Sequence, residues 1–128
     1  MAINPWNFPV WVGFKSIIPA LIAGNTILFK PSPTVPQINL KLEEIFKESE
    51  MEDQLRITFA KTEDIGEKLI AHPQIRSVIF TGSTNVGSIV GSLAGKYLKK
   101  SLLELGGSDP FIVFDDADLE KVIIYFNI

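Results

Sequence analysis

The stretch Phe80-Thr81-Gly82-Ser83-Thr84-Asn85-Val86-Gly87 decides how this chain folds. The short apolar run 77–80 that leads into it has the β-branched and aromatic residues of a buried strand. Residues 86–98, which begin at the end of this stretch and continue past it, have helical spacing. The stretch is therefore predicted to be a glycine turn between a strand and a helix. Such a turn can bind phosphate, because the first backbone N–H groups of a helix have no partner within the helix and its dipole adds positive charge there.

A glycine and two hydroxyl-bearing residues give this turn its chemistry. Gly82 lets the backbone approach a ligand closely, and Ser83 and Thr84 offer hydroxyls as helix caps or phosphate donors. The pattern Gly-x-x-x-x-Gly differs from the Gly-x-Gly-x-x-Gly dinucleotide motif, and it is no P-loop because no Lys-Ser/Thr pair follows Gly87. On its own, the stretch fits an ordinary capped turn as well as a nucleotide site.

Strands and helices are predicted to alternate along the chain. The apolar and alternating runs predict strands at 26–29, 55–59, 76–80, 101–107 and 111–114. Helical spacing predicts helices at 10–22, 35–48, 63–71, 86–98 and from 119 onward. Pro19 is expected to kink or break the first helix, and the prolines within residues 1–9 predict an irregular start. The alternation predicts an α/β fold over one domain, 1–128: a Rossmann-like, doubly wound, mostly parallel sheet of about five strands with helices on both faces.

Chemically distinctive residues lie near the carboxyl ends of three of the predicted strands. In doubly wound sheets the carboxyl ends of the strands meet at one edge, and ligands bind there. The three pairs are Lys30 and Ser32, Gly82 and Ser83, and Glu104 and Gly106. We expect them to lie along one edge, which favours a nucleotide site over a simple capped turn.

Composition and charge exclude several classes of function. A net charge of −3 without a Lys/Arg cluster argues against nucleic acid as a partner. No apolar run is long enough to span a membrane and no basic leader is present, so we expect a cytoplasmic protein without a membrane partner. The chain has no cysteine and its single histidine, His72, precedes a proline, which predicts no metal site. The apolar run 123–126 favours a chain that stops within a domain, or one that pairs with a second copy in a homo-oligomer.

Six short motifs together resemble the aldehyde dehydrogenase family and cover almost the whole chain. They stand in the family's order with near-family spacings. The motifs are Asn4-Pro5-Trp6-Asn7-Phe8-Pro9, Ala23-Gly24-Asn25-Thr26, Lys30-Pro31-Ser32, residues 80–87, Leu103-Glu104-Leu105-Gly106-Gly107 and Phe114-Asp115-Asp116-Ala117-Asp118-Leu119. Within the family, residues 105–113 are most similar to the succinate-semialdehyde dehydrogenase branch.

The resemblance implies oxidation of an aldehyde, such as succinate semialdehyde, to the carboxylic acid with hydride transfer to NAD or NADP. Asn7 would donate its side-chain amide to an oxyanion hole, and Glu104 would be the general base that activates water. Without the family, local sequence favours a turn residue at Asn7 and fits a strand-end salt bridge at Glu104 equally well.

The same resemblance implies cofactor-binding roles for eight residues. They are Lys30 and Ser32 at the adenosine ribose, Gly82 and Ser83 at the pyrophosphate, Val86 at the adenine, Trp6 along the cleft, and Leu105 and Gly106 at the nicotinamide.

Two departures from the family affect these expectations. The position after Lys-Pro-Ser, where the family often has an acidic residue that binds both ribose hydroxyls, is Pro33, so the choice between NAD and NADP stays open. No cysteine is present to act as the nucleophile. We therefore expect a truncated fragment that carries the cofactor-binding region, is inactive alone and meets the aldehyde only as part of the complete enzyme. The alternatives are a fragment that still binds dinucleotide and a truncated product that merely folds and self-associates.

Overall fold

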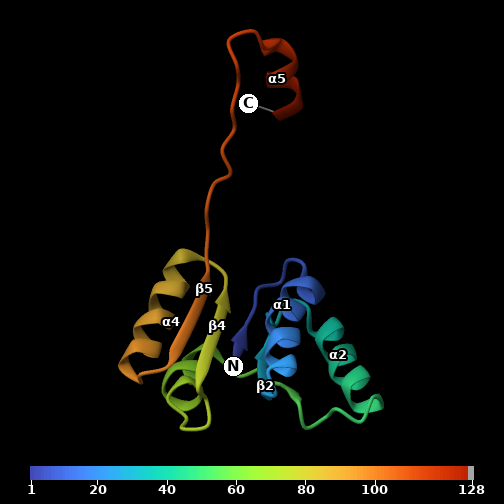
Figure 1. The fold of residues 1–128 in the computed structure, drawn as a ribbon, viewed down its shortest axis with the longest axis vertical. Coiled ribbons are helices and arrows are strands. Elements are labelled where there is room, and N and C mark those ends of the chain that lie inside the picture. The colour runs from blue at the N-terminus through green and yellow to red at the C-terminus, as the bar shows by residue number, and fades with distance from the viewer. Residues whose placement is uncertain (127–128) are drawn as a thin grey trace.

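The computed structural model describes residues 1–126, which contain a five-stranded sheet with helices on both faces (Figure 1). The strands lie in the order β3-β2-β1-β4-β5, and each adjacent pair is parallel. The strands are β1 (Ala2–Ile3), β2 (Ile27–Lys30), β3 (Leu55–Ile57), β4 (Ser77–Thr81) and β5 (Lys100–Glu104). The predicted doubly wound α/β fold is confirmed.

Two hydrophobic clusters join the helices to the two faces of the sheet. On one face, Ile17 of α1 and Leu42 of α2 pack with buried residues of β1, β2 and β3. On the other face, Ile70 of η1 and Val90 of α4 pack with buried residues of β1 and β4. The helical elements are α1 (Pro9–Ile22), α2 (Pro36–Glu48), α3 (Thr62–Asp64), η1 (Ile65–Ile70), α4 (Thr84–Lys96) and α5 (Leu119–Phe126).

The centre of the sheet is a strand that the sequence did not predict. Residues 1–9 were expected to be irregular, but Ala2 and Ile3 form β1, which pairs with both β2 and β4. Both residues are buried, Ala2 completely. A strand of two residues is too short to show the alternating pattern on which strand prediction depends, and the nearby prolines concealed it.

The fifth predicted strand, residues 111–114, is wrong. This segment is not in a strand but in an irregular stretch that leaves the carboxyl edge of the sheet and leads to α5 (Figure 1). Ile112 and Phe114 each expose 72% of their surface. A β-branched run forms a strand only when it joins the backbone hydrogen bonding of a sheet, and the described five-stranded sheet does not include this stretch.

Two predicted helices differ in detail from the expected ones. A kink or a break was predicted at Pro19; helix α1 continues through Pro19 to Ile22, so a break is excluded. The helix ends before Gly24, whose φ of 75° only glycine adopts readily. The helix predicted at 63–71 is a single α turn followed by the π-helical segment η1. None of the helices within residues 1–126 combines the length and apolar character that crossing a lipid bilayer requires.

Candidate functional site

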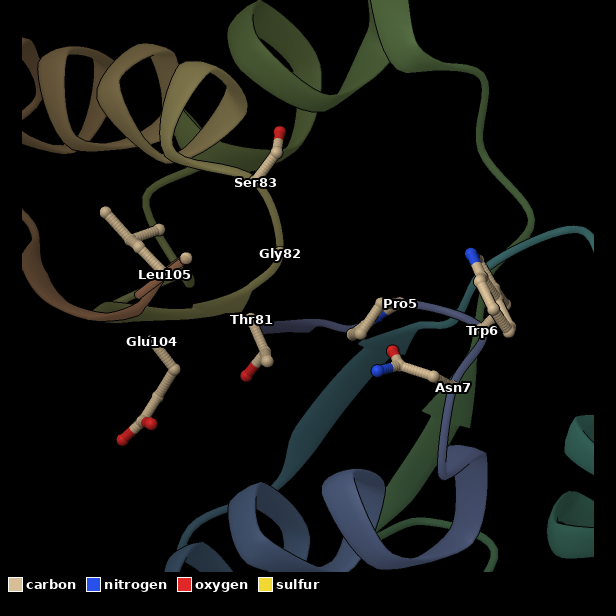
Figure 2. Close-up of a pocket in the computed structure, with 9 residues that line it drawn as sticks. Pro5, Trp6, Asn7, Thr81, Gly82, Ser83, Glu104 and Leu105 are labelled. Atoms are coloured by element: carbon tan, nitrogen blue, oxygen red, sulfur yellow. The ribbon is translucent and has the colours of Figure 1, made fainter. Parts of the chain in front are cut away.

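The candidate site lies where the strand order reverses, between β1 and β4. From β1 the chain adds β2 and β3 on one side, and it then returns to add β4 and β5 on the other. In open parallel sheets, ligands bind beyond the carboxyl ends of the strands at such a reversal. A pocket of about 400 Å³ opens there (Figure 2), lined by Pro5, Trp6, Asn7, Thr81, Gly82, Ser83, Glu104, Leu105 and Gly106.

The turn between β4 and α4 forms one wall of this pocket. The N–H of Gly82 donates to the carbonyl of Glu104 at 3.0 Å, which ties the turn to the end of β5. A Cβ on Gly82 would lie 2.6 Å from the ring of Phe80, so no side chain fits. Ser83 caps α4, and its Oγ accepts a hydrogen bond from the N–H of Val86 at 3.4 Å. The start of α4 therefore borders the pocket, and its partial positive charge suits a phosphate.

The segment between β1 and α1 forms the opposite wall. The ring of Trp6 is 62% exposed, and Asn7 is also exposed. Figure 2 shows the amide of Asn7 directed into the space between Pro5 and Thr81. This wall offers a ligand an aromatic surface and an amide that can donate hydrogen bonds.

Glu104 ends β5 at the open side of the pocket. Its Oε2 lies 3.9 Å from Nζ of Lys15 on α1, and both side chains are about half exposed. An exposed ion pair contributes at most about 1 kcal/mol to stability, so the pair orients the carboxylate rather than holding the fold together. Water reaches this carboxylate, as a general base that activates water requires.

Leu105 and Gly106 follow β5 along the first turn of α4. The side chain of Leu105 fills the space beside Gly87, and a Cβ on Gly106 would lie 3.5 Å from Oγ1 of Thr84. The backbone that continues from Glu104 is thereby held against the start of the helix. The pocket brings together seven of the ten predicted site residues: Trp6, Asn7, Gly82, Ser83, Glu104, Leu105 and Gly106.

Three predicted residues lie outside the pocket lining. Lys30 ends β2, two strands from β4 and thus about 10 Å along the sheet edge. Partial burial lowers the pKa of its ammonium group. Ser32 Oγ donates to Thr34 Oγ1 at 3.1 Å and accepts from the Thr34 N–H at 3.3 Å. Val86, in the first turn of α4, is 44% exposed. Lys30, Ser32 and the pocket therefore share one edge, although they do not share one cavity.

Sequence reasoning missed four residues at or near the site. Pro5 and Thr81 stand within quoted motifs, and the place of Thr81 at the end of a predicted strand was a usable signal. Asn4 was missed because β1 was not recognised as a strand. Lys15 carried no signal, because its ion pair with Glu104 depends on where α1 lies relative to the end of β5.

A second pocket, of about 430 Å³, lies away from the strand ends, between α2 and β3. It is lined by Leu40, Glu43, Glu44, Lys47, Glu52 and Arg56. Three carboxylates against two cations disfavour an anionic ligand there. Within the described residues, no group of three or more His, Cys, Asp or Glu side chains could hold a metal ion.

The residues along the edge match the parts of a dinucleotide. The start of α4 and the side-chain-free Gly82 suit a pyrophosphate. A lysine and two hydroxyls at the end of β2 suit a sugar or a sugar phosphate. Beside the strand reversal, the buried amide of Asn4 has no hydrogen-bond partner among the described residues, so it has capacity left for a ligand.

Comparison with known proteins agrees with this geometry. The family model described as "Aldehyde dehydrogenase family" matches residues 1–126. A succinate-semialdehyde dehydrogenase [NADP(+)] of Deinococcus radiodurans is 43% identical over 96% of this chain and 26% of its own length. A benzaldehyde dehydrogenase [NAD(+)] of Pseudomonas putida is 40% identical over 94% of this chain and 25% of its own length. The chain thus spans about a quarter of the length of these relatives.

Solved structures give the same result. A succinic semialdehyde dehydrogenase from Streptococcus pyogenes, in complex with NADP+ as the cofactor, superposes with a TM-score of 0.84 at 34% identity. The match covers 94% of this chain and 27% of that protein. A succinate-semialdehyde dehydrogenase from Burkholderia pseudomallei gives a TM-score of 0.85 at 37% identity, over 96% of this chain and 26% of that protein.

Proposed function

This chain belongs to the aldehyde dehydrogenase family, and from that premise we propose that it is the dinucleotide-binding part of an NAD(P)-dependent aldehyde dehydrogenase. One observation carries the proposal: nine residues from three separate segments line one pocket at the reversal of the strand order. Such a reversal is where doubly wound sheets bind dinucleotides.

Each part of the dinucleotide has residues of suitable chemistry along the edge. The start of α4, with Gly82 and Ser83, would hold the pyrophosphate through backbone N–H groups. Lys30 and Ser32 would bind the adenosine ribose, and the exposed side chain of Val86 would pack on the adenine. Trp6 would line the cleft. Backbone groups of Leu105 and Gly106 would lie beside the nicotinamide, whose ring accepts the hydride when the cofactor is bound.

NADP is the preferred cofactor in this proposal. No carboxylate stands at Pro33, so nothing there would repel a 2′-phosphate. Lys30 supplies a cation, and Ser32 and Thr34 supply hydroxyls whose oxygens lie 3.1 Å apart. One relative described above carries NADP in its name, and another was solved in complex with NADP+, which supports the same choice.

Two residues would act on the aldehyde. The amide of Asn7, directed into the pocket, would donate a hydrogen bond to the oxygen on which negative charge develops. One such donor lowers a barrier by about 3 kcal/mol in comparable enzymes. Glu104, half exposed at the pocket mouth, would take a proton from the attacking water. Succinate semialdehyde is the proposed substrate, since it is the substrate named for similar proteins.

The nucleophile for such an oxidation would come from outside these 128 residues, because they contain no cysteine. We therefore expect the purified chain to bind dinucleotide without oxidising aldehyde. Calorimetric titration with NADPH and NADH tests binding, and saturable heat with one ligand per chain is expected. Absence of saturable heat for both would overturn the proposal. Steady reduction of NADP with succinic semialdehyde would overturn the expected inactivity.

Self-association is a second candidate property, favoured by exposed apolar side chains at two places. Trp11 and Ile22 on α1 are 70% and 82% exposed, and Tyr125 on α5 is 80% exposed. Apolar surface of this kind commonly marks an interface between proteins. Light scattering tests this property: a dimer or larger species supports it, and a clean monomer at high concentration contradicts it.

A further inference from the structure

Asn4 is a buried polar residue at the centre of the sheet edge. It directly follows β1, the strand at which the order reverses, and it directly precedes Pro5 in the pocket wall. Its backbone N–H donates to the carbonyl of Lys30 at 3.1 Å, so its Cα is fixed beside the end of β2. Only 5% of the residue is exposed.

The side-chain amide of Asn4 has no partner within the described part of the protein. Both Nδ2 and Oδ1 are buried, and neither makes a hydrogen bond to residues 1–126. Asn39, which is also buried, in α2, shows the usual arrangement: its Nδ2 donates to the carbonyl of Val35. Folded proteins pair nearly all such groups, because an unpaired buried amide destabilises the fold. A residue that departs from this rule beside a pocket is a candidate for pairing with a ligand.

A second unfavourable feature lies at the other end of the same pocket wall. Phe8, the N-cap of α1, has φ 47° and ψ 51°, which is left-handed backbone that a bulky side chain rarely adopts. It makes no side-chain capping hydrogen bond. The pocket-lining segment Pro5–Asn7 thus lies between an unpaired amide and a strained residue. Strain concentrated at a binding site is a known means of preparing a segment to move.

We propose that Asn4 is a ligand-binding residue: when a dinucleotide binds, the segment Pro5–Asn7 shifts and the amide of Asn4 pairs with a ribose hydroxyl. The inference rests on the proposed function, because it takes the dinucleotide as the ligand. A hydroxyl is the matching group because it both accepts and donates, and so it can pair with Nδ2 and Oδ1 together. A phosphate oxygen only accepts, and it would leave Oδ1 unpaired. The Asn4–Lys30 backbone hydrogen bond keeps the residue in place while the segment after it moves.

Replacement of Asn4 by leucine, a side chain of similar size without polar atoms, gives the decisive test. The Asn4→Leu variant is expected to unfold at a temperature about 3 °C higher, because an unpaired amide has been removed. Its affinity for NADPH and for ADP-ribose, measured by calorimetry, is expected to fall at least tenfold. Asn39→Leu is the matched control: it should unfold at a lower temperature, because it breaks a hydrogen bond, and should bind both ligands with unchanged affinity.

Two results would overturn the role of Asn4. A destabilised or unfolded Asn4→Leu protein would show that the amide is paired within the fold, as in Asn39. Unchanged affinity for ADP-ribose would show that the amide does not bind a ribose hydroxyl, even if affinity for NADPH falls. The Asn4→Ala variant removes the amide without introducing the branched side chain of leucine, and it should show the same loss of affinity. If the wild-type chain itself binds no dinucleotide, the proposed function fails, and the assignment of Asn4 to that ligand fails with it.

Discussion

The side chain of Leu105 occupies the space that a Cβ on Gly87 would need. Leu105 directly follows Glu104 at the end of β5, and Gly87 lies in the first turn of α4. This contact joins the start of the helix, where we place a pyrophosphate, to the backbone that carries the proposed general base. The distance between these two parts of the site is therefore set by the absence of a side chain at one position.

Alanine at Gly87 should disturb both parts of the site. The added Cβ would overlap Leu105, and overpacking of this kind costs about 1–3 kcal/mol of unfolding free energy. Calorimetry should also show weaker NADPH binding, since Leu105 and Gly106 must move. Gly95→Ala is the matched control, because a Cβ there meets no atom within 4 Å and alanine favours the helix by up to about 1 kcal/mol. Equal stability of the two variants would contradict the account.

The two roles assigned to Ser83 can be separated by substitution. Ser83→Ala removes the cap on α4 and should cost about 1 kcal/mol of unfolding free energy in urea. Ser83→Asp keeps a capping oxygen, so its stability should stay near that of wild type, but its negative charge should repel the pyrophosphate and weaken NADPH binding at least tenfold. Undiminished binding by Ser83→Asp would remove the start of α4 from the phosphate site.

Cofactor choice should respond to charge at residue 33. Pro33→Glu places a carboxylate beside Lys30 and Ser32, where it can accept hydrogen bonds from ribose hydroxyls and repel a 2′-phosphate. The ratio of NADPH to NADH affinity should fall at least tenfold. Pro33→Gln, which has the same length without the charge, should change this ratio much less. Equal changes in the two variants would show that loss of the proline ring, rather than charge, decides the outcome.

Glu67 should make stability depend on pH. Its carboxylate accepts hydrogen bonds from the hydroxyl of Tyr97 and from Nζ of Lys96, and these bonds lower the pKa of Glu67. A carboxyl group with a lowered pKa stabilises the fold above the pKa that it has in the unfolded chain. That contribution is lost as the pH falls through its folded-state pKa.

Urea unfolding at several pH values measures this effect. Wild type should therefore lose more stability between about pH 6 and about pH 3 than Glu67→Gln. Tyr97→Phe should reduce the pH dependence in the same direction, because it removes the first of the two donors. Parallel losses in wild type and Glu67→Gln would contradict the assignment.

Much of the fold could be predicted because its helices and longer strands carry their own periodic patterns. The apolar run 77–80 and the stretch 80–87 became β4, a glycine turn and the start of α4. Two strand predictions failed because strand formation there depends on neighbouring strands and not on a local pattern. The two residues of β1 are too few for a pattern, and only their neighbours β2 and β4 make them a strand. Residues 111–114 have strand-like composition but belong to none of the five strands of the described sheet.

The site was predictable wherever its residues lie near the carboxyl end of a predicted strand, as Gly82 and Glu104 do. Its fine arrangement was not predictable, because it depends on contacts between elements. The ion pair of Lys15 with Glu104 and the contact of Leu105 with Gly87 join residues far apart in the sequence. The unpaired state of the Asn4 amide could not be predicted either, because the amide is buried only as a result of the pairing of β1 with its neighbouring strands.

The most direct test of the central claim, that the carboxyl edge of this sheet binds a dinucleotide, is an NMR titration of the labelled chain with NADPH. The account predicts saturable shifts of amide signals at four places along that edge: Asn4–Asn7, Lys30–Ser32, Gly82–Val86 and Leu105–Gly106. Unchanged spectra, or shifts confined to the charged pocket between α2 and β3, would contradict it.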